Sequence, residues 1–131
     1  MPDFKDLLQT ADWKTEKHVP VIEAPDKIKN GDLLTVEVSV GKQIAHPNTT
    51  EHHIRSIDVY FLPAGEKFPY SVSRLEFCVH GASIQGPNTS TVFCEPKGTA
   101  VFKTAKSGTI IAAAFCNIHG IWQSEKQVQV L

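Results

Sequence analysis

Apolar and polar residues alternate in short segments along most of the chain. The clearest segment spans residues 33–40 and follows the turn signal Asn30-Gly31-Asp32. Gly-, Pro- and Asn-containing turns separate further segments that are rich in β-branched and aromatic residues. These further segments are residues 54–62, 72–79, 89–94, 99–104, 109–116 and 127–131. The pattern therefore predicts about seven short strands.

About seven strands with turns at intervals of roughly ten residues are typical of an antiparallel β-sandwich or barrel. Residues 3–9 predict one or two helical turns ahead of the strands. No long linker, repeat or low-complexity tract interrupts the chain, so we expect residues 1–131 to form a single domain. Most histidines fall in the predicted loops, where a rigid β scaffold usually presents functional groups.

Composition excludes several classes of protein. The chain has 131 residues, of which 41% are hydrophobic and 21% charged, as in ordinary globular proteins. Thirteen basic and fourteen acidic residues give a net charge of −1, which disfavours nucleic acid or an anionic membrane as the main partner. No apolar run is long enough to span a membrane, and the first residues lack the apolar stretch of a signal peptide. We therefore expect a cytoplasmic protein.

The three cysteines, Cys78, Cys94 and Cys116, are an odd number and lie far apart in the sequence. An odd number excludes a complete disulfide framework, and the absence of a Cys-x-x-Cys pair excludes a zinc ribbon or an all-thiolate iron centre. Cys78 and Cys94 lie beside Phe77 and Phe93, so we expect buried, inert thiols. A disulfide between these two stays possible. Cys116 alone has a metal-binding neighbour.

That neighbour is His119, in the segment Cys116-Asn117-Ile118-His119-Gly120 that ends an apolar strand. A thiolate and an imidazole three residues apart can bind one metal ion. Further imidazoles occur at His18, His46 and His52. A soft thiolate combined with several imidazoles suits iron, copper or zinc. The residues alone leave the choice among these metals open.

His46 and His52 are separated by a segment that does not fit a straight strand. In an extended chain the two imidazoles would lie roughly 20 Å apart, whereas metal–nitrogen bonds are about 2 Å long. Pro47 disfavours a central strand, and the residues 48–50 (Asn-Thr-Thr) favour a turn. The segment can therefore fold back and bring His46 and His52 together. The alternative is a polar surface loop that happens to contain histidines.

A third candidate segment is Glu16-Lys17-His18-Val19-Pro20. Pro20 keeps this segment extended, so Glu16 and His18 should share a face while Lys17 points elsewhere. Glu16 could then approach a metal, and Lys17 could place a positive charge beside it. The alternative is a solvated Glu-Lys pair next to an ordinary loop histidine.

Two other histidines are expected to lie outside the metal-binding group. His53 follows His52 directly, so its side chain points in a different direction once the strand begins, at the surface or behind the ligands. His80 falls in a turn between two predicted strands. We expect His80 to be structural or solvated.

Together with Gly86-Pro87-Asn88-Thr89-Ser90, the segments 16–20, 46–53 and 116–120 resemble superoxide reductases of the one-iron neelaredoxin type, and the motifs occur in the same order. A larger branch of that family, desulfoferrodoxin, carries an additional N-terminal domain with a four-cysteine iron site. This chain has no cysteine before Cys78, so it resembles the branch without that domain. The resemblance implies an immunoglobulin-like β-barrel, in agreement with the strand count.

The resemblance also implies a mononuclear iron with four equatorial imidazoles and one axial thiolate. The corresponding residues are His18, His46, His52 and His119, with Cys116 as the axial ligand. Glu16 matches the glutamate that occupies the sixth position in the ferric state, and Lys17 matches the lysine beside the open position. The implied reaction is the one-electron reduction of superoxide to hydrogen peroxide without formation of dioxygen.

Two rival interpretations use the same β fold. A blue-copper electron carrier needs two imidazoles, one thiolate and usually a weak axial methionine. The only methionine is Met1, and the chain offers more imidazoles than copper requires. An immunoglobulin-like binding module with a structural zinc would be colourless and closed by four ligands. For the reductase, the resemblance implies rubredoxin or a similar small redox protein as electron donor, and a homo-oligomer, often a tetramer.

Overall fold

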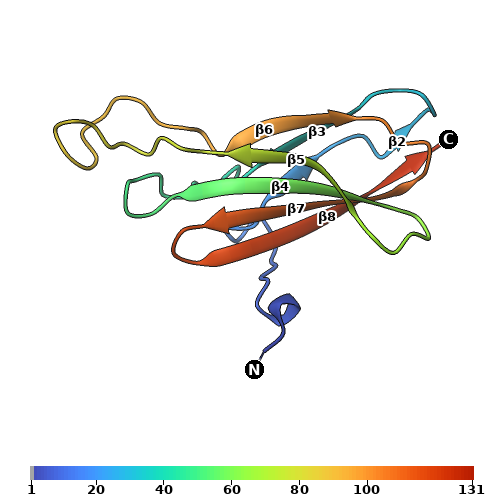
Figure 1. Ribbon diagram of the computed structural model, residues 1–131, viewed down its shortest axis with the longest axis horizontal. Helices are drawn as coiled ribbons and strands as arrows, with labels where there is room; N and C mark the ends of the chain where they lie inside the picture. Colours follow the sequence, from blue (N-terminus) through green and yellow to red (C-terminus); the bar gives the residue numbers. More distant parts are fainter. Residues whose placement is uncertain (1) are drawn as a thin grey trace.

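Two β-sheets packed face to face make up most of the computed structural model, which describes residues 2–131 (Figure 1). One sheet has the strand order β1-β3-β6, and the other has the order β2-β8-β7-β4-β5. The strands are β1 (Val21–Glu23), β2 (Lys27–Ile28), β3 (Leu34–Ser39), β4 (Ile54–Pro63), β5 (Tyr70–Glu76), β6 (Lys97–Phe102), β7 (Gly108–Cys116) and β8 (Gly120–Val130). All pairs are antiparallel except β2 with β8.

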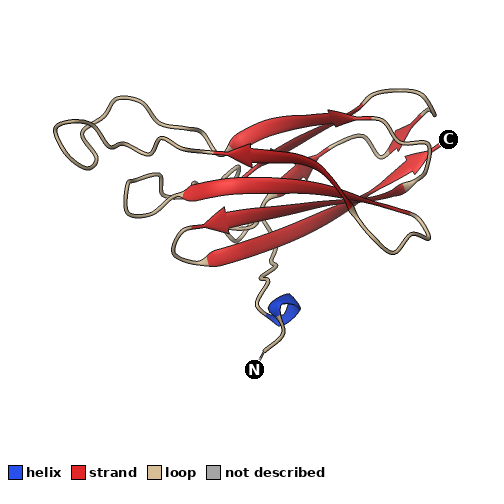
Figure 2. Ribbon diagram, viewed as in Figure 1, coloured by secondary structure: helices blue, strands red, loops and turns tan. Residues whose placement is uncertain are grey.

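The predicted all-β sandwich with a short N-terminal helical turn is confirmed. The turn is a single 3-10 turn, η1 (Phe4–Asp6), and it is the only helical element among residues 2–131 (Figure 2). In the described part of the chain no helix has the length and apolar character needed to cross a membrane.

The alternation read from the sequence produces the core. On β3, Leu34, Val36 and Val38 all point inward and are fully buried. On β7, Ile110 and Ala112 do the same from the opposite sheet. Removing a Val, Leu or Ile side chain from water stabilises the fold by roughly 1.5–3 kcal/mol. The register is therefore fixed, because a shift by one residue would turn these side chains to the solvent.

One predicted strand does not form. Residues 89–94 belong to a long irregular loop, residues 77–96, which we call the arm, and their only ladder contact is an isolated bridge between His80 and Phe93. Val92 and Phe93 are largely exposed, so this segment has no core to face. Its β-branched and aromatic residues gave a strand signal, but a strand needs a buried face to be stable.

Other boundaries differ in ways that follow from packing. The last strand, predicted over residues 127–131, begins at Gly120, because its polar first half pairs with β7 and is only partly buried. The short strands β1 and β2 were not predicted. They hold three and two residues, too few to show a period.

Three irregular segments gather at one end of the sandwich. They are the β3–β4 loop (residues 40–53), the arm and the turn between β7 and β8, and all lie at the end opposite the C-terminus (Figure 1). The N-terminal segment runs along β8 near this end, where Gln9 forms a bridge with Trp122. Every residue predicted to bind a metal lies in or next to these segments.

Candidate metal centre

Cys116 is the last residue of β7 and lies on its inward face, where it is 1% exposed. Its register partner is Gly120, so only three residues form the turn between β7 and β8. Gly120 closes the turn with φ +80, a conformation that favours glycine. The turn brings His119 back over the sulfur: its backbone N–H donates to Sγ at 3.4 Å, and its Nδ1 lies 3.7 Å from Sγ.

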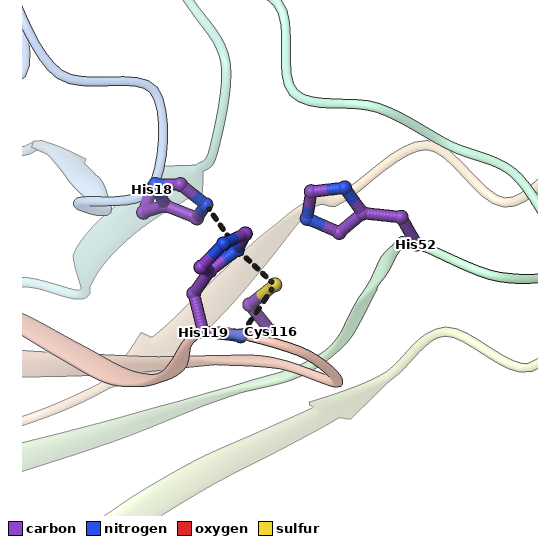
Figure 3. A group of neighbouring side chains, drawn as sticks. All are labelled: His18, His52, Cys116 and His119. Atoms are coloured by element: carbon purple, nitrogen blue, oxygen red, sulfur yellow. Dashed lines mark hydrogen bonds between the residues drawn. The ribbon is translucent and has the colours of Figure 1, made fainter.

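Four of the predicted residues meet at this point: His18, His52, Cys116 and His119 (Figure 3). Each offers one ligand atom, and these four atoms lie within 4.8 Å of one another. Nε2 of His18 is 3.1 Å from Nδ1 of His119, while His52 faces them from the β3–β4 loop. One metal ion could therefore contact all four, although they come from three separate segments of the chain.

His46 joins the group through its ring. The ring centroid is 4.9 Å from that of His18 and 4.7 Å from that of His52. Nδ1 of His46 donates to the carbonyl of Pro47 at 2.7 Å, so its Nε2 keeps a lone pair. The chain turns tightly before His46. Gly41 has φ +91, and a Cβ at this position would lie 2.9 Å from the backbone nitrogen of His46.

The Nε2 atoms of His46 and His52 are both buried without a hydrogen-bond partner among the described residues. Leaving a buried polar atom unpaired costs about 1–3 kcal/mol, so two such nitrogens in one cluster need an explanation. A metal ion supplies it, because imidazole lone pairs are metal ligands. The donor set, several imidazole nitrogens and one thiolate, fits iron, copper or zinc.

The protonation state of the cluster suits a metal. The pKa of His46 is lowered to about 4, mainly by burial and then by the charges of His18, His52 and Lys17, which together outweigh the hydrogen bond to the carbonyl of Pro47. The pKa of His52 is also lowered, first by burial and then by the neighbouring His119. Both rings are therefore neutral at neutral pH, as metal ligands must be. The charge of Lys17 is among the smaller causes that lower both pKa values.

Glu16 contacts the group from outside. Its Oε1 accepts from the backbone N–H of His18 at 2.7 Å and lies 2.6 Å from Nδ1 of that ring. Burial alone would raise the pKa of Glu16, but these hydrogen bonds and the charge of His18 outweigh it and lower the pKa. The expectation that Glu16 and His18 share a face is confirmed. A proton on Nδ1 directs the Nε2 lone pair of His18 to the cluster.

Sequence reasoning missed a residue that contacts two histidines of the group. Trp122 stacks on His18, with ring centroids 5.0 Å apart and planes at 17°. Its Nε1 donates to the carbonyl of His119 at 3.1 Å. The only signal in the sequence was its position three residues after His119, which is not distinctive.

Three asparagines also support the site and had no assigned role. Asn117, inside the Cys116–His119 segment, accepts from the backbone N–H of His53 and donates to the carbonyl of Glu51, both at 2.9 Å. Asn48, in the β3–β4 loop, and Asn88, in the arm, make hydrogen bonds that tie this loop to the arm. Asparagines near turns are common, so sequence could not separate these from ordinary turn residues.

His53 and His80 form a pair behind the cluster. Their rings stack with centroids 3.6 Å apart and planes at 5°, and Nδ1 of His53 donates to the carbonyl of Thr49. His80 is 8% exposed, so the expectation of a structural residue is confirmed and that of a solvated one is wrong.

The expectation of two buried, inert thiols is wrong for Cys78. That thiol is exposed because β5 ends at Glu76 and the arm leaves the core there. Cys94 is half-buried, and both thiols are free. The pairing of His80 with Phe93 sets Cys94 opposite Val79, so the side chains of Cys78 and Cys94 leave opposite faces of this pair of segments.

Several known proteins are similar to this chain in sequence and in fold. The sequence profile of the desulfoferrodoxin family matches residues 10–125. Superoxide reductase of Pyrococcus furiosus is 55% identical over 122 residues, which cover 93% of this chain and 96% of that protein. Neelaredoxin of Megalodesulfovibrio gigas is 52% identical over 123 residues, covering 94% and 95%. The structure of reduced superoxide reductase from Archaeoglobus fulgidus has a TM-score of 0.87 and 55% identity, with coverages of 94% and 98%.

Proposed function

The chain belongs to the desulfoferrodoxin family and is a superoxide reductase with a mononuclear iron cofactor, and we propose that five of its side chains hold that iron. The proposed ligands are Nε2 of His18, His46 and His52, Nδ1 of His119, and Sγ of Cys116. The observation that carries this assignment is the pair of buried, unpartnered Nε2 atoms on His46 and His52. His52 belongs to the group with His18, Cys116 and His119, and the ring of His46 packs against the rings of His18 and His52.

The rival metals are not favoured. A blue-copper site would leave two of the four imidazoles without a role. A structural zinc site takes four ligands and would leave one of the five donors unused. The family relationship and the number of imidazoles agree on iron.

When bound, the iron supplies one electron to superoxide, which leaves as hydrogen peroxide after taking up two protons, without release of dioxygen. Lys17 attracts the superoxide anion and holds a water that donates a proton. Two points support this role: the charge of Lys17 contributes to the lowered pKa of His46 and His52, and no ion pair within residues 2–131 neutralises it. A positive charge beside a metal concentrates small anions there although the whole chain has a net charge of −1.

Glu16 has two roles in this proposal. In the structure it orients His18, through the contact of its Oε1 with Nδ1. Its carboxylate would also serve as a further ligand when the iron is oxidised and would be released when the iron is reduced. This second role requires the carboxylate to move off His18, and its partial exposure supports such a movement.

The electron donor in this proposal is a small redox protein such as rubredoxin. The chain assembles as a homo-oligomer, and the family resemblance implies a tetramer. Ile84, Val92 and Phe93 on the arm support an assembly, because they offer exposed apolar surface that an interface between copies would bury. A cytoplasmic location is supported by three unpaired cysteines. Light scattering, reduction by added rubredoxin and cell fractionation test these three points.

Metal analysis and pulse radiolysis of the purified chain test the function. We expect one iron per chain, consumption of superoxide, and hydrogen peroxide without dioxygen. The variant Cys116→Ala serves as control and is expected to lose the visible absorption of the oxidised protein. Zinc or copper in place of iron, or dioxygen released together with peroxide, would overturn the proposal.

A further inference from the structure

The β3–β4 loop carries two of the proposed ligands but has no regular secondary structure. Its segment 48–53 is instead tied to the arm at several points. Asn48 Nδ2 donates to the carbonyl of Cys94 at 2.8 Å, and the backbone N–H of Thr50 donates to Oδ1 of Asn88 at 2.9 Å. The positions of His46 and His52 therefore depend on a part of the chain that holds no ligand.

One side chain of the arm contacts both ends of this segment. Nδ1 of His80 lies 2.9 Å from Oδ1 of Asn48, and the His80 ring stacks on His53 at 3.6 Å. Nε2 of His80 lies 2.6 Å from the carbonyl of Phe77, at the base of the arm. The carbonyl of Phe77 and Oδ1 of Asn48 are both acceptors, and a neutral imidazole has a single N–H, so the ring donates to one of them at a time.

These contacts place His80 against residues that lie next to two of the proposed ligands in the sequence. Asn48 is two residues from His46, and His53 is the neighbour of His52. A shift of His80 therefore moves the backbone next to each of the two rings. Metal sites tolerate little such movement, because ligand atoms must be held to within about 0.5 Å.

We propose that His80 is a positioning residue for the iron site: it clamps the segment 48–53 and so fixes His46 and His52 at metal-binding distance. This inference rests on the proposed ligand set, although His80 itself touches no proposed ligand atom. Its burial at 8% exposure and its use of both ring nitrogens distinguish it from the more exposed polar residues of the arm.

Two variants separate the contacts of His80. His80→Phe keeps a ring to stack on His53 but loses the polar contacts of both ring nitrogens, whereas His80→Gln keeps an amide that can donate and loses the ring. Ser83→Ala is a matched control, because Ser83 binds Thr89 within the arm and does not contact the segment 48–53. The Gln variant also keeps the proposal testable if the Phe variant fails to fold.

The measurement is the rate at which the iron-loaded full chain loses iron to a chelator, followed by visible absorption. We expect loss about tenfold faster in His80→Phe, at the lower end of the range for groups that support metal ligands. His80→Gln should lie between His80→Phe and the wild-type chain, and Ser83→Ala should match the wild type. Unchanged iron loss in both His80 variants, or an equal acceleration in Ser83→Ala, would overturn the positioning role.

Amide hydrogen exchange gives a second readout that does not depend on activity. In His80→Phe, exchange should accelerate in residues 46–53 while the strands of the core keep their protection. Unchanged protection in that loop would contradict the clamp. Absence of iron from the wild-type chain would overturn the proposed function, and hydrogen exchange alone would then decide the role of His80.

Discussion

The carboxylate of Glu16 lies 2.6 Å from Nδ1 of His18, while Nε2 of the same ring lies 3.1 Å from Nδ1 of His119. The carboxylate therefore orients the ring of His18 through Nδ1, and His18 presents its Nε2 to the other proposed metal ligands. This arrangement fixes the tautomer of a metal-ligating histidine and increases its basicity. Glu16 and His18 are two residues apart, so their contact is local and needs no other part of the site.

Removing this carboxylate should weaken iron binding. For Glu16→Ala we expect about tenfold faster loss of iron to a chelator, because His18 loses its orienting partner. The visible absorption of the oxidised protein should also change if Glu16 is the sixth ligand. Glu66→Ala is the control, because Glu66 follows the far end of β4 and pairs with Lys106, away from the site. An unchanged spectrum would exclude the sixth-ligand role, and unchanged iron loss would exclude the orienting role.

Lys17→Ala should slow the reaction with superoxide by about tenfold, because the charge that attracts the anion is lost. The rate should also depend less on ionic strength. Pulse radiolysis at several salt concentrations measures both effects. Lys14→Ala is a matched control, since Lys14 lies over the ring of Trp13 in the same segment. A Lys17→Ala rate equal to that of the control contradicts the steering role.

Gly120→Ala should strain the turn that joins Cys116 to His119. A left-handed conformation costs a non-glycine residue about 1–2 kcal/mol, and no atom lies within 4 Å of an added Cβ, so strain is the only cost. Gly31→Ala is the control, with φ +98 and equal free space far from the site. In urea unfolding both variants should lose similar stability. Only Gly120→Ala should also lose iron faster, and equal iron retention would disconnect the turn from the site.

The iron-free chain should lose stability as the pH falls from 6.5 towards 4. Burial lowers the pKa of His46 to about 4 and also lowers that of His52, so the unfolded chain, with an ordinary pKa of 6.5, binds protons first. Each proton bound only by the unfolded chain favours unfolding. Urea unfolding at pH 7, 6 and 5 measures the effect, above the range where carboxyl groups titrate. In His46→Gln the slope should be smaller, and a stability that rises with acid would contradict this account.

Much of the fold could be predicted from the sequence, because every second side chain is apolar and faces inward in the strands that build the core. The predicted strands 33–40 and 109–116 correspond to β3 and β7, and each of the four ends differs by one residue or less. The prediction of a strand over residues 89–94 was wrong, because nothing in the sequence shows that Val92 and Phe93 face solvent. Burial is a property of the folded chain, and local pattern reports only the capacity for it.

For the site, the sequence by itself determined the local pairs. Glu16 meets His18 across two residues, and Cys116 meets His119 across a three-residue turn closed by Gly120, since short separations leave the backbone few alternatives. Only the tertiary structure decided what joins these pairs. Contacts from the arm hold the β3–β4 loop over β7, and Trp122 packs against His18. Such contacts join residues tens of positions apart, and no local pattern encodes them because their geometry is fixed by the packing of the two sheets.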